Sequence, residues 1–109
     1  MNKSDYVTPP YHIGFKAKKI YGEPIKGEFL DCAIAYIEPN GGGPRPSHTH
    51  QHSHFFIVTK GVATIHIGQE LFRIKEDEAI YVDGKIKHSI WNETDKELKM
   101  IGITINTKN

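Results

Sequence analysis

The histidine-rich stretch from residue 42 to residue 61 reads GGPRPSHTHQHSHFFIVTKG. Four histidines stand at alternate positions within it, at 48, 50, 52 and 54, and a glycine stands at each end. Side chains at positions i and i+2 leave an extended strand on the same side. His48 and His50 therefore share a face, about 7 Å apart along the backbone, and their rings can converge on one point. Two such imidazoles form half of a metal site.

On either side of this stretch the pattern predicts an all-β chain, because no window shows a sustained helical period and many short segments alternate or are β-branched. Turn residues separate these segments, most clearly PNGGGP at 39–44. Seven or eight short strands favour a sandwich or a barrel. The expected strands are Phe29–Glu38, His54–Lys60, Val62–Ile67, Glu70–Ile74, Ala79–Val82, His88–Asn92 and Glu97–Ile105, with an earlier one within Tyr11–Tyr21.

Length and composition limit the classes of protein that fit. The chain has 109 residues, which predicts a single domain over 1–109. Residues 1–10 of this domain are expected to form an extended N-terminal arm. A formal charge of +1 does not provide the basic surface that nucleic-acid binding needs. No apolar run reaches the roughly 20 residues of a membrane span, and Met1–Pro10 has no secretory apolar segment. We therefore expect a cytoplasmic protein with no nucleic-acid or membrane partner.

Two features predict self-association. In the expected strand 98–105, Ile101, Ile103 and Ile105 form one face, while Leu98 and Met100 lie on the other. A strand that is apolar on both faces suits a sheet covered on both sides, as at a subunit contact. The proline-containing arm at 1–10 could also lie across a partner. A two-fold homodimer is the expected assembly.

Further histidines extend the half site. His54 opens the next expected strand, and His88 opens another after the Asp83-Gly84 turn. Four imidazoles form a nitrogen site that suits one divalent transition metal ion, such as Zn, Fe, Mn, Ni or Cu, better than Ca or Mg. The alternative is a solvated histidine-rich loop. The shared spacing with His88 and the flanking glycines favour the metal site.

These residues resemble the cupin family. The first cupin motif has a glycine, five residues, His-x-His, three or four residues, a glutamate, six residues and a glycine. The stretch from Gly42 to Gly61 fits every spacing, with His54 in place of the glutamate. The second motif is matched more loosely over 82–92: its first glycine is absent, Val82 replaces its proline, and the spacing from Gly84 to His88 is one residue longer. The spacing from His88 to Asn92 is intact.

The resemblance implies a small double-stranded β-helix, or jelly-roll, cupin barrel with a metal at His48, His50, His54 and His88. It also implies a metal-dependent enzyme of the dioxygenase, isomerase, lyase or cyclase type. Because four neutral ligands leave the charge of the ion whole, the substrate is expected to be a small anionic or carbonyl-containing molecule. The alternative is a non-catalytic cupin that binds or senses a small molecule.

Other residues are candidates for the pocket or for contacts to the ligands. The motif leaves His52 free, which makes it a rim or supporting residue. Aromatic side chains supply the apolar wall of a small-molecule pocket. Arg45 is a candidate for binding an anion, although a surface role fits it as well. His12 and His66 have no signal of this kind. The pocket candidates are His52, Tyr36, Phe56, Tyr81, Asn92 and Arg45, and the sequence identifies no catalytic residue among them.

Overall fold

The computed structural model describes residues 5–21 and 29–106, and all its regular structure is β-strand. The strands are β1 (Ile13–Tyr21), β2 (Phe29–His48), β3 (Ser53–Lys60), β4 (Ala63–Ile67), β5 (Glu70–Ile74), β6 (Ala79–Val82), β7 (His88–Trp91) and β8 (Leu98–Ile105). The all-β prediction is confirmed. The described residues include no helix with the length and hydropathy needed to span a membrane.

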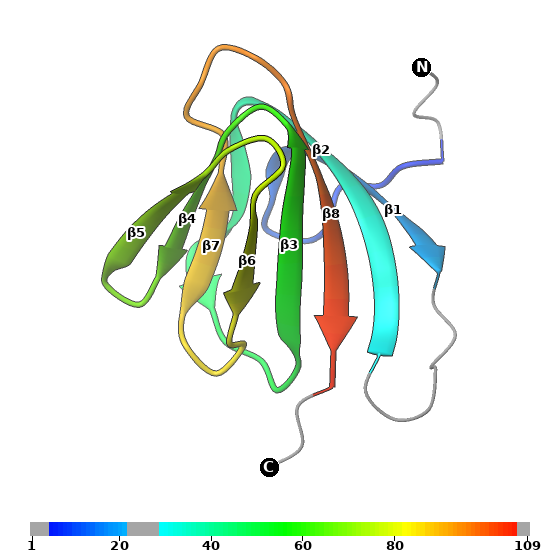
Figure 1. Cartoon of the computed structure of the whole chain (residues 1–109), viewed down its shortest axis with the longest axis vertical. Coiled ribbons are helices and arrows are strands. Elements are labelled where there is room, and N and C mark those ends of the chain that lie inside the picture. Colours follow the sequence, from blue (N-terminus) through cyan, green and yellow to red (C-terminus); the bar gives the residue numbers. More distant parts are fainter. Residues whose placement is uncertain (1–4, 22–28, 107–109) are drawn as a thin grey trace.

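The strands form one sheet that is nearly closed into a barrel (Figure 1). Its order is β5-β4-β7-β2-β8-β3-β6, with β1 paired to β2, and every pairing is antiparallel. Strands β2, β8 and β3 lie side by side on one half of the barrel, and β4, β5 and β7 lie on the other. This is the jelly-roll arrangement that the family resemblance implies.

Strand β2 joins the two halves, which corrects the prediction of a turn at 39–44. Its first part pairs with β1 and β8, and its second part pairs with β7. Asn40, with a positive φ of 66°, lies where the register shifts, and its N–H donates to the carbonyl of Asn92 at 2.8 Å. The N–H of Asn92 donates in turn to the carbonyl of Gly41 at 2.9 Å. The residues that signal a turn therefore bend a continuous strand around the barrel corner.

The core fills the space between the two halves. The residues with least exposure include Ile37, Val58, Ile65, Leu98 and Met100. Their side chains come from four different strands, β2, β3, β4 and β8, so the core joins both halves. On β8 the alternate residues 101, 103 and 105 are only half-buried and lie on the opposite face. The prediction that this strand is apolar on both faces is confirmed.

The described part of the N-terminal arm lies on its own chain. Val7 exchanges two backbone hydrogen bonds with Ala17 of β1, at 2.9 and 2.8 Å. The ring of Tyr6 meets that of Tyr36 edge to face, with 5.6 Å between centroids. Val7 therefore adds one isolated bridge to β1, and residues 1–4 of the predicted arm lie outside the described residues.

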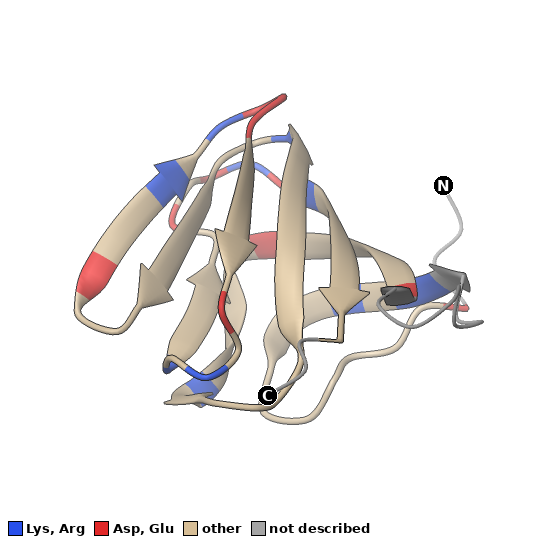
Figure 2. Cartoon of the chain, turned by 60° about the horizontal axis from the view of Figure 1, so that its bottom comes forward, with Lys and Arg blue, Asp and Glu red and all other residues tan. Residues whose placement is uncertain are grey.

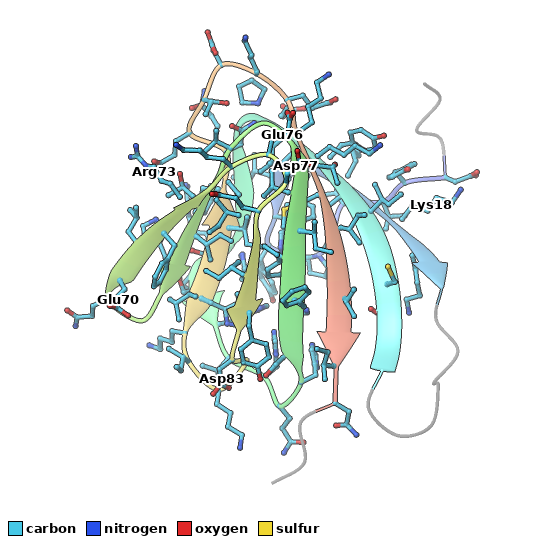
Figure 3. All side chains as sticks on the ribbon, viewed as in Figure 1. Lys18, Glu70, Arg73, Glu76, Asp77 and Asp83 are labelled. Atoms are coloured by element: carbon cyan, nitrogen blue, oxygen red, sulfur yellow. The ribbon has the colours of Figure 1, made fainter. Side chains whose placement is uncertain are left out.

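Charged side chains are spread around the molecule. Figure 2 shows blue and red segments on many strands and loops, with both signs interleaved. Several of them, including Glu70, Arg73 and Asp83, point outward in Figure 3. In contrast to these dispersed charges, several histidine side chains are clustered at one end of the barrel.

Candidate metal centre

Five histidines meet at the lower end of the barrel, where β2 ends and β3 and β7 begin. Backbone register places them there: His48 is the last residue of β2 and pairs with His88, the first residue of β7. His54 is the second residue of β3 and pairs with Val82 of β6 and Thr104 of β8. His50 and His52 lie in the short connection between β2 and β3. Residues from three strands and one loop thus reach a common centre.

The imidazole nitrogens lie at close range. Nε2 of His50 is 3.2 Å from Nε2 of His54 and also 3.2 Å from Nε2 of His88. His48 meets both His50 and His88 edge to face, with centroids 4.9 and 5.0 Å apart. Two overlapping sets have ligand nitrogens within 4.8 Å of one another, and both contain His50. The sets are His48, His50 and His88, and His50, His52 and His54.

Backbone hydrogen bonds fix the protonation of two rings. Nδ1 of His50 lies 2.6 Å from the carbonyl oxygen of His52, and Nδ1 of His88 lies 2.8 Å from that of Ile86. A carbonyl oxygen can only accept, so each Nδ1 carries the proton and donates it. In the neutral rings both Nε2 atoms are then bare acceptors. Two facing lone pairs repel one another unless one cation binds both.

The donor set fits a divalent transition metal. Metal–nitrogen bonds of about 2.0–2.1 Å place neighbouring ligand nitrogens roughly 2.9–3.4 Å apart in tetrahedral or octahedral geometry. The observed 3.2 Å separations lie in this range. Donation from a ring nitrogen to a backbone carbonyl is also the usual support of a metal-bound histidine. A histidine cluster that could hold a metal ion is therefore present.

The environment favours the neutral form of three of these rings, the form that metal binding requires. Burial, and after it the neighbouring imidazoles, lowers the pKa of His54 from 6.5 to about 3. Burial likewise lowers the pKa of His48 and, despite the opposing hydrogen bond to the carbonyl of Ile86, that of His88. At neutral pH the rings of His48, His54 and His88 therefore carry no second proton that a metal ion would have to displace.

A tight turn supports the loop that holds His50. The turn between β6 and β7 contains Asp83, labelled at the bottom of Figure 3, and Gly84. The N–H of His50 donates to the carbonyl of Gly84 at 2.8 Å, and the N–H of Gly84 donates to Oγ of Ser53 at 3.1 Å. A Cβ at Gly84 would lie only 2.6 Å from Nδ1 of His50. Glycine is needed here because the His50 ring packs directly against the backbone.

The histidines open into a cavity of about 340 Å³. Phe56 belongs to its wall, as the sequence predicts, and the His54 ring stacks on it with centroids 5.1 Å apart. His52 also belongs to the wall and stacks on His50 at 3.9 Å. The remaining wall residues are His12, Phe15, Gly43, Pro44, His48, His88 and Ile90. This volume suits a small organic molecule with one end at the histidines.

Two of the predicted aromatic candidates lie elsewhere. Tyr36 is buried beneath Tyr6, and the ammonium group of Lys99 lies 5.4 Å from its ring centre. Tyr81 is 49% exposed. Each tyrosine follows a strand neighbour, Ala35 or Ile80, whose side chain packs in or against the core, so strand alternation turns the tyrosine outward. Neither residue is in the cavity wall.

Asn92 and Arg45 have structural contacts instead. The Asn92 amide is fully buried and donates to the carbonyls of Ile37 and Lys96 at 2.9 and 2.7 Å. It joins β2 to the β7–β8 loop. The exposed Arg45 guanidinium lies over the Trp91 ring, 4.9 Å from its centre. Neither side chain is in the cavity wall.

Of the titratable residues in the cavity wall, His12 is the one that the sequence did not predict. It precedes β1, and its Nδ1 lies 2.7 Å from the carbonyl oxygen of Pro10, which leaves Nε2 unprotonated in the neutral ring. Its ring also meets Phe15 edge to face at 4.5 Å. It reaches the cavity because β1 pairs with β2 around Gly42, a contact between distant segments that no local motif signals.

Comparison with known proteins gives a family match. The model of the cupin domain family matches residues 33–104, about two thirds of the chain. No curated protein matches the chain.

Solved structures show the same fold at low sequence identity. A cupin-2 domain from Rhodospirillum rubrum has a TM-score of 0.75 and 13% identity, and the match covers 91% of this chain but only 64% of that one. The cupin domain of an XRE family transcriptional regulator from Enterobacter cloacae has a TM-score of 0.76 and 15% identity, covering 89% and 100%. The polyketide cyclase RemF from Streptomyces resistomycificus has a TM-score of 0.76 and 17% identity, covering 98% and 78%.

Proposed function

Since the chain belongs to the cupin family, we propose that it binds one divalent transition metal ion through His48, His50, His54 and His88. We further propose that it is an enzyme that acts on a small carbonyl-containing or anionic molecule bound in the histidine-lined cavity. The observation that supports this proposal most strongly is the pair of 3.2 Å contacts of Nε2 of His50 with Nε2 of His54 and His88. At His50 and His88 these nitrogens are bare, since each Nδ1 donates to a carbonyl.

An all-histidine set determines which substrates bind well. When bound, such an ion supplies Lewis acidity toward an oxygen atom of the substrate, or O₂ chemistry if it is redox-active. Four neutral ligands cancel none of its charge, and the cavity wall includes no carboxylate among its described residues. An anionic or readily enolised oxygen therefore gains most from binding at this end of the cavity.

The groups available for proton transfer are then His12 and His52, the two histidines of the cavity wall outside the proposed ligand set. Nε2 of His12 is unprotonated in the neutral ring, because Nδ1 donates to the carbonyl of Pro10. His52 is held against His50 by ring stacking. Either imidazole can accept a proton from carbon or oxygen at neutral pH. Isomerase, lyase and cyclase reactions commonly use such a group, and the cyclase RemF shares this fold.

A non-catalytic ligand-binding or sensing module is the second candidate function. It is favoured by the match to the whole cupin domain of a transcriptional regulator. Such a module would retain the metal and the cavity but would turn over no substrate.

We also propose a homodimer. Half-buried apolar side chains from three adjacent strands, Ile34, Ile57 and Ile101, lie in one row on the outer face of the sheet. Covering this row with a second copy would bury it from water. Light scattering should give twice the 12.4 kDa chain mass, and a particle of single-chain mass would refute the dimer.

The test of the metal site is elemental analysis of protein purified without added metal. The parent protein should contain close to one transition metal ion per chain, and the His48→Ala and His88→Ala variants should contain little. His66→Ala is the matched control, since His66 lies on β4 and is not in the cavity wall. Equal metal content in all four proteins would contradict the ligand assignment.

A turnover screen separates the enzyme from the binding module. Metal-loaded protein is incubated with diketones, catechols, thiols and keto-sugars, and O₂ uptake and proton NMR are followed. The proposal expects turnover of at least one class, lost in a His12→Gln, His52→Gln double variant that retains its metal. Binding without turnover across the screen would favour the sensing module.

A further inference from the structure

A second cavity lies beside the histidine-lined one. Its volume is about 120 Å³, and it shares three wall residues with the first cavity, Phe15, His54 and Phe56. A molecule with one end at the histidines therefore has a neighbouring space into which a side branch can extend.

The space exists because small residues line the inner face of three adjacent strands, β1, β2 and β8 (Figure 1). Ala17 pairs with Ala35, Ala35 pairs with Met100, and Ala33 pairs with Gly102, so these five positions lie on one face of the sheet. Larger apolar residues at these positions would fill the space as they do elsewhere in the core.

The aromatic partition between the cavities depends on the same strand. A Cβ at Gly102 would lie 3.1 Å from Cε1 of Phe56, which is tighter than most real contacts. The absence of a side chain at residue 102 therefore allows the Phe56 ring to lie close to β8. In that position the ring forms part of the wall of both cavities.

The polar groups at the edge of the second cavity already have partners. The carboxylate of Asp31 lies 3.7 Å from Nζ of Lys19, and Oγ1 of Thr104 lies 3.4 Å from Nδ1 of His54. The rest of the wall is apolar and consists of Met100, three alanines, Gly102 and the rings of Phe15 and Phe56. Such a surface favours a group without polar atoms.

From this geometry we infer that the second cavity is a specificity pocket for a short alkyl substituent of the molecule held at the histidines. An engineered apolar cavity of about 150 Å³ holds benzene, so 120 Å³ accepts an alkyl chain of about four carbons. The ligand class is thus a small oxygen chelator that bears a short aliphatic branch. This inference rests on the proposed metal site.

The experiment measures the affinity of Zn²⁺-loaded protein for alkyl hydroxamates of increasing chain length by calorimetry. Acetohydroxamate tests the metal end alone, and butyrohydroxamate adds two methylenes. Each methylene buried in an apolar site contributes roughly fourfold in affinity, so butyrohydroxamate should bind about 15-fold more tightly. Octanohydroxamate should gain little more, because its chain exceeds the cavity.

Two further measurements locate the gain. Ala33→Val fills the cavity and should reduce the 15-fold gain to less than about threefold while leaving acetohydroxamate affinity unchanged. Ala79→Val is the matched control, because it makes the same change at an exposed position of β6 outside both cavities. In protein labelled with ¹³C-methyl methionine, butyrohydroxamate should shift the Met100 signal and not that of Met1. This measurement needs no variant and holds even if Ala33→Val fails to fold.

The outcomes separate the two proposals. If acetohydroxamate binds but affinity does not rise with chain length, or rises equally in Ala33→Val, the pocket is refuted and the metal site stands. An unchanged Met100 signal also refutes the pocket. If acetohydroxamate does not bind to metal-loaded protein, the proposed ligand site fails, and the pocket that depends on it fails too.

Discussion

Replacing Gly84 by alanine should damage the metal site from outside the cavity. The turn that contains Gly84 supports the His50 loop through the hydrogen bond from His50 N–H to the Gly84 carbonyl, 2.8 Å long. An added Cβ would lie 2.6 Å from Nδ1 of His50 and closer still to the carbonyl oxygen of His52. These two atoms are the donor and acceptor that orient the His50 ring.

The size of the effect follows from the distances. Real Cβ atoms essentially never come closer than 3.0 Å, so Nδ1 of His50 must move by at least about 0.4 Å and the His52 carbonyl by more. Metal–ligand distances tolerate about 0.2 Å, so His50 would leave its bonding position. A structural zinc site supplies about 10–16 kcal/mol over four ligands, and the loss of one ligand should weaken Zn²⁺ binding roughly 100-fold. The overpacking should also lower the free energy of unfolding by about 1–3 kcal/mol.

The assay is calorimetric Zn²⁺ titration combined with thermal unfolding of the metal-free protein. Gly68→Ala is the control: its φ of 61° makes alanine unfavourable by roughly 1 kcal/mol, yet its Cβ would meet nothing closer than 3.4 Å. The control should lose stability and retain its Zn²⁺ affinity. Wild-type affinity in Gly84→Ala would show that His50 is not both positioned by this turn and bound to the metal.

Three other results are expected. Metal-free protein should lose stability as the pH falls from 6.5 toward 3, because the pKa of His54 is lowered in the folded protein and the unfolded chain therefore takes up the proton first. In urea unfolding, this group should lower the free energy of unfolding by up to about 1.4 kcal/mol per pH unit. A flat profile would contradict this prediction. Asn92→Ala should lower the free energy of unfolding by about 2–4 kcal/mol, because two backbone carbonyls lose their hydrogen-bond donor in a fully buried site. Its metal content should stay unchanged. Asp95→Ala, at an exposed position, is the control in thermal unfolding. His50→Ala should weaken Zn²⁺ binding by at least about 100-fold in a competition assay, whereas affinity within tenfold of the parent would show that His50 is no ligand.

Strand alternation and turn residues were sufficient to predict most elements of the fold. Segments such as Glu70–Ile74 and Ala79–Val82 have the predicted bounds, because each is short and ends at clear turn residues. The proline- and glycine-rich segment at 39–44 was predicted as a turn and is part of β2. Composition cannot distinguish the two, because a strand that changes partners at a barrel corner needs the same permissive backbone as a turn.

The spacing of the histidines predicted that His48, His50, His54 and His88 lie near one another, and the structure places them in two overlapping clusters: His48, His50 and His88, and His50, His52 and His54. Local alternation and the pairing of His48 with His88 account for the first cluster. Residues whose position depends on long-range packing were harder to predict. Tyr36 and Tyr81 were predicted to line the pocket because they are aromatic. Side chains alternate between the two faces of a strand, and both tyrosines lie on the face away from the cavity. His12 joins the wall only through the pairing of β1 with β2.

Anomalous scattering from crystals of the protein grown with Zn²⁺ would locate the bound ion itself. We predict one strong peak per chain, bonded at about 2.0–2.1 Å to ring nitrogens of residues 48, 50, 54 and 88. A peak bound by other groups, or no peak within reach of the His50 ring, would contradict it.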